Sequence, residues 1–194
     1  MILDDLKEIV YVIPNHCGHL PFVKNNIERI KKLCDNLTVF EGLLTDIDSI
    51  LKHTRENEHS LLIYDDMFTD IINSRAFNHL ATFGARHHNC CLIVTSQNLF
   101  EVGRYSVSIR RQFSYYTIYY PNSERNMIVT LGRNLFPTNP MVLLNCFRKL
   151  IPHTKNHYDQ YLVIDVNPKS KLPFSMRIRS NFFSEEQFFF IVDE

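Results

Sequence analysis

Two segments of the sequence are apolar runs that end in polar side chains. Residues 61–66 read Leu-Leu-Ile-Tyr-Asp-Asp, and residues 90–97 read Cys-Cys-Leu-Ile-Val-Thr-Ser-Gln. The carboxyl ends of parallel strands face one crevice of an α/β sheet, so both polar tips are expected to meet there. Adjacent carboxylates at a strand end can hold Mg²⁺ and orient a water, which is the chemistry that phosphoryl transfer needs.

Each polar residue at these strand ends has a predicted role. Asp65 is predicted to bind Mg²⁺ through a water, and Asp66 to polarise the water that attacks a phosphate. Gln97 and Asn98 are predicted to contact the γ-phosphate or that water. A simpler interpretation stays open for both segments: Asp-Asp ends a strand and begins a turn, and Gln97 lies in an ordinary strand-to-loop junction.

A series of arginines follows the second polar tip. Its first member, Arg104, is the best candidate for an arginine finger that acts on a neighbouring subunit, or for a contact to DNA phosphate. The alternative for any one of them is a solvated surface arginine. The series consists of Arg104, Arg110, Arg111, Arg125 and Arg133.

Other clusters of reactive side chains have weaker patterns. Residues 16–19 (His-Cys-Gly-His) and 87–91 (His-His-Asn-Cys-Cys) do not match the ligand spacing of a tetrahedral zinc site, and Cys90 and Cys91 would point to opposite faces of a strand. A metal-dependent nuclease built on Asp65 and Asp66 lacks a further acidic cluster for a second ion. The sequence therefore favours the nucleotide chemistry over both alternatives.

The bulk properties predict one domain over residues 1–194 that lies inside the cell. The chain is 45% hydrophobic and carries 21 basic and 21 acidic side chains, so bulk charge does not mark it as a nucleic-acid-binding module. Five cysteines without framework spacing indicate a reducing compartment. No apolar run is long enough to span a membrane, and no signal peptide is recognisable. We expect a soluble cytoplasmic or nuclear protein without a membrane partner.

Strands and helices are predicted to alternate along the chain. Strands are expected at 9–13, 37–40, 61–64, 90–95, 113–119, 161–165 and 174–179. Helices are expected at 22–33, 45–55, 69–83, 106–111, 123–134 and 138–149. Thr69 is expected to cap its helix, Gly84 to end it, and the aromatic tail at 184–194 to pack as a last helix or strand. This alternation predicts an α/β three-layer sandwich around a mostly parallel sheet.

Four stretches together resemble one protein family. They are residues 61–66, 84–89 (Gly-Ala-Arg-His-His-Asn), 92–100 (Leu-Ile-Val-Thr-Ser-Gln-Asn-Leu-Phe) and 134–137 (Asn-Leu-Phe-Pro). The chain resembles the FtsK/HerA-type genome-packaging ATPases of Maverick/Polinton transposons, which have relatives in poxviruses and other large double-stranded DNA viruses. The similarity runs from about residue 9 to residue 183, nearly the whole chain.

The resemblance implies a RecA-like ASCE P-loop NTPase core that forms a ring and pumps double-stranded DNA into a capsid, with ATP and Mg²⁺ as cofactors and capsid proteins as partners. It assigns 61–66 to the Walker B strand, 90–97 to the sensor strand, and 158–194 to C-terminal strands and a tail. Asp65 matches the magnesium-side acid, Asp66 the catalytic acid, Gln97 the sensor, and Arg104 the arginine.

The chain departs from this family in its phosphate-binding loop. The motif GxxxxGK[ST] is absent, and the family's first strand and P-loop are expected before residue 9, so the domain is predicted to be truncated at its N-terminus. Residues 121–124 (Pro-Asn-Ser-Glu) also differ from the family pattern. Without the lysine and the loop amides, ATP binding and hydrolysis should be weak. The alternative is a non-catalytic relic that oligomerises or contacts DNA.

Overall fold

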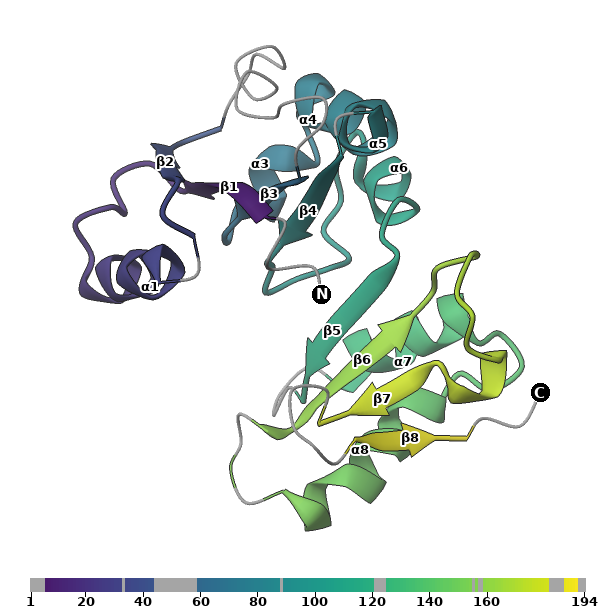
Figure 1. The fold of residues 1–194 in the computed structure, drawn as a ribbon. Helices are drawn as coiled ribbons and strands as arrows, with labels where there is room; N and C mark the ends of the chain where they lie inside the picture. The colour runs from purple at the N-terminus through teal and green to yellow at the C-terminus, as the bar shows by residue number, and fades with distance from the viewer. Residues whose placement is uncertain are drawn as a thin grey trace. The chain divides into compact units, whose positions relative to one another are not determined.

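The computed structural model describes residues 6–32, 34–43, 59–87, 89–120, 125–154, 156, 159–181 and 187–191. Contacts within the chain divide it into two compact units, Met1–Gln112 and Phe113–Glu194, which Figure 1 shows as ribbons. The predicted helix at 45–55 lies outside the described residues. Among the helices that are described, none combines the length and the apolar character needed to cross a membrane.

The first unit contains a parallel sheet of four strands. They are β1 (Leu6–Ile13), β2 (Leu37–Glu41), β3 (His59–Tyr64) and β4 (Cys90–Val94), in the order β2-β1-β3-β4. β1 is rich in β-branched residues and is buried from Ile9 to Ile13, as a central strand covered on both faces should be. The resemblance predicts that the family's first strand, which is central in the usual strand order of the family, precedes residue 9 and is missing. In the part of the chain that the structure describes, β1 itself takes a central position.

Helices pack against both faces of this sheet, which confirms a layered α/β arrangement. α1 (Pro21–Lys31) covers one face, where its Val23 joins Tyr11 and Ile13 of β1 in a buried cluster. On the opposite face, Phe77 packs edge-on against Tyr64, with ring centroids 4.8 Å apart. The helices after β3 are α3 (Phe68–Ile71), α4 (Arg75–His79), a π-helical turn η1 (Leu80–Gly84), α5 (Ala85–His87) and, beyond β4, α6 (Ser106–Arg110).

The single helix predicted from Thr69 to Phe83 is wrong in its boundaries. The chain leaves the helical path after α3 because a distant segment takes over its hydrogen bonds: the Tyr105 N–H donates to the Ile72 carbonyl at 2.8 Å. Ser74 then caps α4 by accepting from the Phe77 N–H at 3.1 Å, a role predicted for Thr69. Gly84 does not end the helix, which continues to His87.

The second unit contains an antiparallel sheet of four strands in the order β5-β6-β7-β8. We expected these strands in a mostly parallel sheet. Parallel neighbours in a sheet are usually joined by a crossover through one helix, whereas two helices, α7 and α8, separate β5 from β6. No α-helix lies in the described residues between β6 and β7 or between β7 and β8. The predicted strand at 174–179 begins instead with the 3₁₀ turn η4 (Phe174–Met176), and the tail contributes a strand, β8. The elements are β5 (Tyr115–Tyr119), α7 (Arg125–Leu135), α8 (Val142–Leu150), the 3₁₀ turn η2 (Ile151–His153), β6 (Tyr161–Asp165), β7 (Ile178–Ser180) and β8 (Phe188–Phe190).

Candidate functional site

A cleft of about 480 Å³ lies at the carboxyl ends of β1, β3 and β4. The chain passes from β1 to β2 on one side and then to β3 on the other, so the strand order reverses between β1 and β3. Ligands of open α/β sheets bind at such a reversal. One wall of the cleft is apolar and includes Pro14, Cys17 and Phe22, and the other carries Asp65, Asp66, Thr95, Ser96 and Gln97.

The Asp65 carboxylate is held by hydroxyl donors on both of its oxygens. Tyr11 Oη donates to Oδ2 at 2.5 Å, and Thr95 Oγ1 donates to Oδ1 at 2.6 Å. The Asp65 backbone is also held, because its N–H donates to the Val12 carbonyl at 2.9 Å and so extends the hydrogen bonding between β3 and β1. Each carboxylate oxygen keeps a second lone pair, so Asp65 can still accept from a metal-bound water.

Asp66 and Gln97 meet as the sequence predicts. Gln97 Nε2 donates to Asp66 Oδ2 at 3.2 Å, and the Asp66 N–H donates to Thr95 Oγ1 at 2.8 Å. The Thr95 hydroxyl therefore links both acids. Asp66 has a positive φ of 54°, a left-handed conformation that asparagine and aspartate adopt more readily than other non-glycine residues. This backbone turn directs the exposed Asp66 carboxylate toward the β4 loop.

Asn98 and Arg104 do not line the cleft in the described part of the chain. The Asn98 side chain accepts from the Phe100 N–H at 3.0 Å and so shapes its own loop. The Arg104 guanidinium lies over the Tyr105 ring, 5.4 Å from its centroid, and is exposed. A contact from Asn98 to a phosphate, and an action of Arg104 on a neighbouring copy, stay predictions.

The segment between β1 and α1 borders the cleft through Pro14 and Cys17, a placement that sequence reasoning missed. A strand that ends at Ile13 and a helix that begins at Pro21 bracket residues 14–20, a loop of seven residues in a strand–loop–helix unit, whereas GxxxxGK[ST] has eight positions. When Gly18 is aligned with the second glycine of the motif, Ile13 stands in place of the first glycine, and His19 and Leu20 stand where lysine and serine or threonine belong. The sequence signal for this loop is the spacing between the β-branched run and Gly18.

An internal carboxylate is bound to this loop. The His16 N–H donates to Glu41 Oε2 at 3.0 Å, with His16 at φ 65°. A Cβ atom on Gly18 would come within 2.2 Å of Glu41 Oε1, so a side chain at this position would displace the Glu41 carboxylate from the loop. Glu41 thus uses at least one loop amide that a phosphate would otherwise accept from.

The donors of the cleft fit a magnesium ion better than a bare phosphate. Among the described residues that line it, none carries a positive charge. No group of three His, Cys, Asp or Glu side chains gathers anywhere in the described chain. Mg²⁺ is commonly bound through one or two carboxylates plus waters and substrate phosphates, which matches Asp65 and Asp66.

Comparisons with protein-family models, with curated proteins and with solved structures gave no match. The function is therefore inferred from the geometry of the cleft and from the residues that line it.

Replacing Tyr11 by phenylalanine should lower the free energy of unfolding by about 1–2 kcal/mol at pH 7, because the Asp65 carboxylate loses a buried donor. Burial, and next the hydrogen bond to Asp65, raise the pKa of Tyr11 to about 12. The stabilisation by this neutral hydroxyl is therefore complete below pH 10, the ordinary tyrosine pKa, and is lost as the pH rises toward 12. Urea denaturation at several pH values measures it.

Tyr115→Phe is the matched control for this prediction, because Tyr115 is exposed on another strand. The difference between the wild-type protein and Tyr11→Phe should shrink between pH 10 and 12, whereas the control should show no difference at pH 7. Equal stability of the wild-type protein and Tyr11→Phe at pH 7 would show that the Tyr11–Asp65 hydrogen bond contributes nothing.

Proposed function

We propose that the cleft binds a magnesium–ATP complex and that the chain is an ATP-dependent double-stranded DNA translocase domain of the FtsK/HerA packaging type, with weak hydrolysis. The observation that carries the proposal is the pair of adjacent acids, Asp65 and Asp66, at the point where the strand order reverses. Thr95 hydrogen-bonds to both, and Gln97 to one.

Each side chain has a role in this proposal. Asp65, fixed by Tyr11 and Thr95, would hold a Mg²⁺ ion through a water, and the ion would supply positive charge beside the phosphates. Asp66 accepts a hydrogen bond from an O–H of the attacking water, and Gln97, which donates to Asp66, orients that water. The exposed Phe22 ring offers an apolar surface to the base.

Weak hydrolysis follows from the altered loop. His19 and Leu20 cannot supply the ammonium group and the hydroxyl of the standard motif, and Glu41 adds negative charge beside the loop amides. Nucleotide phosphates are then held chiefly through the metal. The proposal includes an intracellular RecA-like domain, cytoplasmic or nuclear, in a ring of copies around double-stranded DNA. Arg104 reaches a neighbouring cleft, and capsid proteins are the partners.

A second candidate is a non-catalytic relic that oligomerises or binds DNA. It is favoured by the lack of a cationic side chain among the described residues of the cleft. The two candidates differ in nucleotide dependence, because a relic should self-associate or bind DNA equally well with and without ATP.

Removal of Mg²⁺ with EDTA should weaken binding of a fluorescent ATP analogue by about tenfold or more, since the metal carries the attraction between phosphates and carboxylates. Asp65→Asn should weaken binding in Mg²⁺ to a similar extent and leave little further response to EDTA. Fluorescence titration measures both effects. Asp70→Asn, an exposed acid on α3 outside the cleft, is the control and should bind like the wild-type protein. Binding that is indifferent to Mg²⁺ and to Asp65→Asn would overturn the proposed site.

A further inference from the structure

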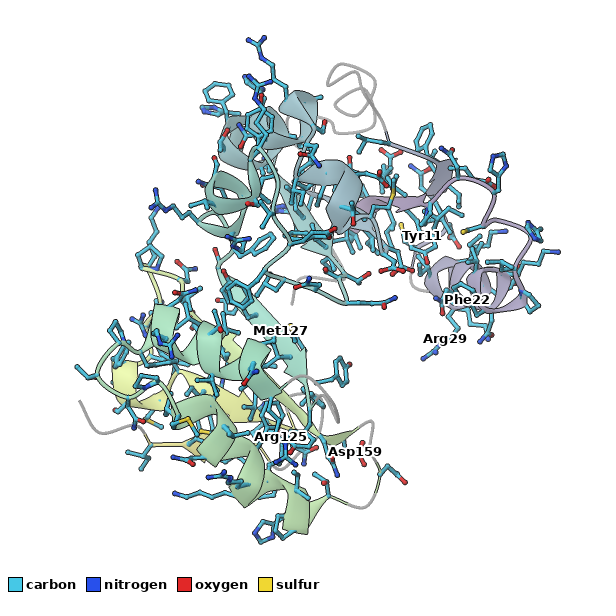
Figure 2. The ribbon with its side chains drawn as sticks, turned by 180° about the vertical axis from the view of Figure 1, so that it is seen from behind. Tyr11, Phe22, Arg29, Arg125, Met127 and Asp159 are labelled. Atoms are coloured by element: carbon cyan, nitrogen blue, oxygen red, sulfur yellow. The ribbon has the colours of Figure 1, made fainter. Side chains whose placement is uncertain are left out.

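A cavity of about 680 Å³ lies in the second unit, between α8 and β8. In Figure 1 the strands β5–β8 lie in front of α7 and α8, and in Figure 2, seen from behind, the helices lie in front of the strands. β8 is last in the strand order β5-β6-β7-β8, so the cavity lies at one edge of the described sheet. Its volume is that of an ordinary small-molecule site.

The inner part of this cavity is apolar. On α8, the buried side chains of Val142, Cys146 and Leu150 follow one another at helical spacing and line it. From β8, Phe188 and Phe190 line it as well. Burial raises the pKa of the Cys146 thiol to about 12, so the thiol is neutral at pH 7 and belongs to the apolar wall. An apolar ligand placed between helix and strand would therefore be removed from water on two sides.

Positive charge lies beside this apolar wall. Arg148 and Lys149 are exposed in the last turn of α8, and both line the cavity. The Lys149 charge acts on the Cys146 thiol and lowers its pKa against the larger effect of burial, so the ammonium group is near the apolar wall. Arg148 Nη1 donates to Asn145 Oδ1 at 3.2 Å, and this neutral amide leaves the guanidinium charge uncompensated. Among the described residues, no acidic side chain lines the cavity, and neither cation forms an ion pair.

The two cations exceed what the end of α8 requires. A helix C-terminus carries the equivalent of about half a negative charge, which a basic side chain in the last turn commonly balances. Arg148 and Lys149 together leave a net positive charge at the cavity. His153 of η2 adds a ring nitrogen there, with its ring centroid 6.3 Å from that of Phe188. A carboxylate or a phosphate complements such a group of donors, because its oxygens accept charge-assisted hydrogen bonds from guanidinium and ammonium groups.

We propose that the cavity between α8 and β8 binds a small amphipathic anion, with its apolar body against Cys146, Leu150 and Phe188 and its carboxylate or phosphate at Arg148 and Lys149. A mostly apolar lining with a few convergent polar groups is the usual form of a small-molecule site. Charge complementarity selects the anion over a neutral apolar ligand of the same size. The cavity lies in the other unit from Asp65 and Asp66, so this inference goes beyond the proposed nucleotide site and does not depend on it.

A second copy of the chain is the competing occupant, because its own apolar side chains would also cover the β8 rings. In a two-fold dimer through this cavity, each copy brings the same patch to the interface. The described lining residues would then contribute two cations from each copy and no carboxylate, and like charges oppose such an association. The charges therefore favour a separate anion.

Isothermal titration calorimetry with decanoate, decyl phosphate and decanol tests the proposal. At least one of the two anions should bind about tenfold or more tightly than decanol, which has the same chain without the charge. Lys149→Gln should weaken binding of that anion by about threefold or more and leave decanol binding unchanged, and Lys149→Arg should keep the anion affinity. Phe188→Ala should weaken binding of anion and alcohol alike. Lys171→Gln, which removes an exposed charge of the same unit outside the cavity, is the matched control.

Three outcomes would overturn the proposal: no binding of either anion, decanol binding as tight as that of both anions, or equal effects of Lys149→Gln and Lys171→Gln. A dimer in sedimentation that Phe188→Ala dissociates would also overturn it, since a second copy would then fill the cavity. Lys149 and Phe188 are exposed, so their variants should fold, and circular dichroism checks this. Asp65→Asn should leave anion binding unchanged, so failure here and failure of the proposed nucleotide site are distinguishable.

Discussion

Replacing His19 by lysine and Leu20 by threonine should raise the affinity for Mg²⁺–ATP by about 10- to 100-fold. Both residues lie in the loop between β1 and α1, at the positions that carry lysine and a hydroxyl in GxxxxGK[ST]. A charge-assisted hydrogen bond to phosphate contributes about 1.5–3 kcal/mol, and a hydroxyl can hold the metal. Titration of a fluorescent ATP analogue measures the gain, and phosphate release reports whether hydrolysis and DNA stimulation appear with it.

Single replacements and a charge control separate the causes. Leu20 packs against the buried cluster under α1, so Leu20→Thr alone should lower stability without raising affinity. His79→Lys adds the same charge on α4 and should leave binding unchanged. In the restored double variant, Asp66→Asn should abolish hydrolysis. If the double variant binds no better than the wild-type protein, then the loop is not the phosphate-binding segment, whatever Asp65 and Asp66 do.

Replacing Phe77 by alanine should lower the free energy of unfolding of the first unit by about 3–5 kcal/mol. Phe77 is almost fully buried and meets the Tyr64 ring edge-on at 4.8 Å. Among the described residues the buried Tyr64 hydroxyl has no hydrogen-bond partner, so packing is what holds this ring in place. Tyr64 directly precedes Asp65, and a cavity beneath it should also loosen the carboxylate and weaken Mg²⁺-dependent binding. Denaturation and nucleotide titration measure the two effects.

Phe83→Ala is the control for this prediction, because Phe83 is largely exposed and contacts only the His79 and His87 rings among the described ring contacts. Its effect should stay below about 1 kcal/mol. Phe77→Leu, which fills most of the space, should fall between the two. If Phe77→Ala lowers the free energy of unfolding as little as the control does, then the side chains packed behind β3 fill the vacated space freely.

The strands of the first unit could be predicted from sequence because their residues carry a strong local signal. Residues 9–13 and 61–64 are β-branched, aromatic or aliphatic, and both segments are strands in the structure. The meeting of Asp66 with Gln97 could be predicted as well, since parallel strands bring their carboxyl ends together. Local propensity and one topological rule were sufficient for these features.

Other features depend on contacts between distant residues and leave little local trace. The helix after Phe68 stops because Gly103 approaches Ile72 so closely that a Cβ would come within 2.5 Å of it, and because Tyr105 takes the Ile72 carbonyl. Tyr11 donates a hydrogen bond to Asp65, which is 54 residues away in the sequence. The residues around Tyr11 indicate only that it lies in a strand. The antiparallel sheet of the second unit likewise follows from its connections rather than from its strand sequences.

The left-handed backbone at Asp66 restricts how this protein can change by point mutation. At φ 54° glycine, asparagine and aspartate fit at a lower cost than a longer side chain such as glutamate. Asparagine and glycine, which the fold accepts most easily, therefore remove the carboxylate. Glutamate would keep a carboxylate on a longer side chain, but it strains the turn. One mutation can therefore remove the Asp66 carboxylate without unfolding the protein. Placing a different acid at this position also requires a change in the turn.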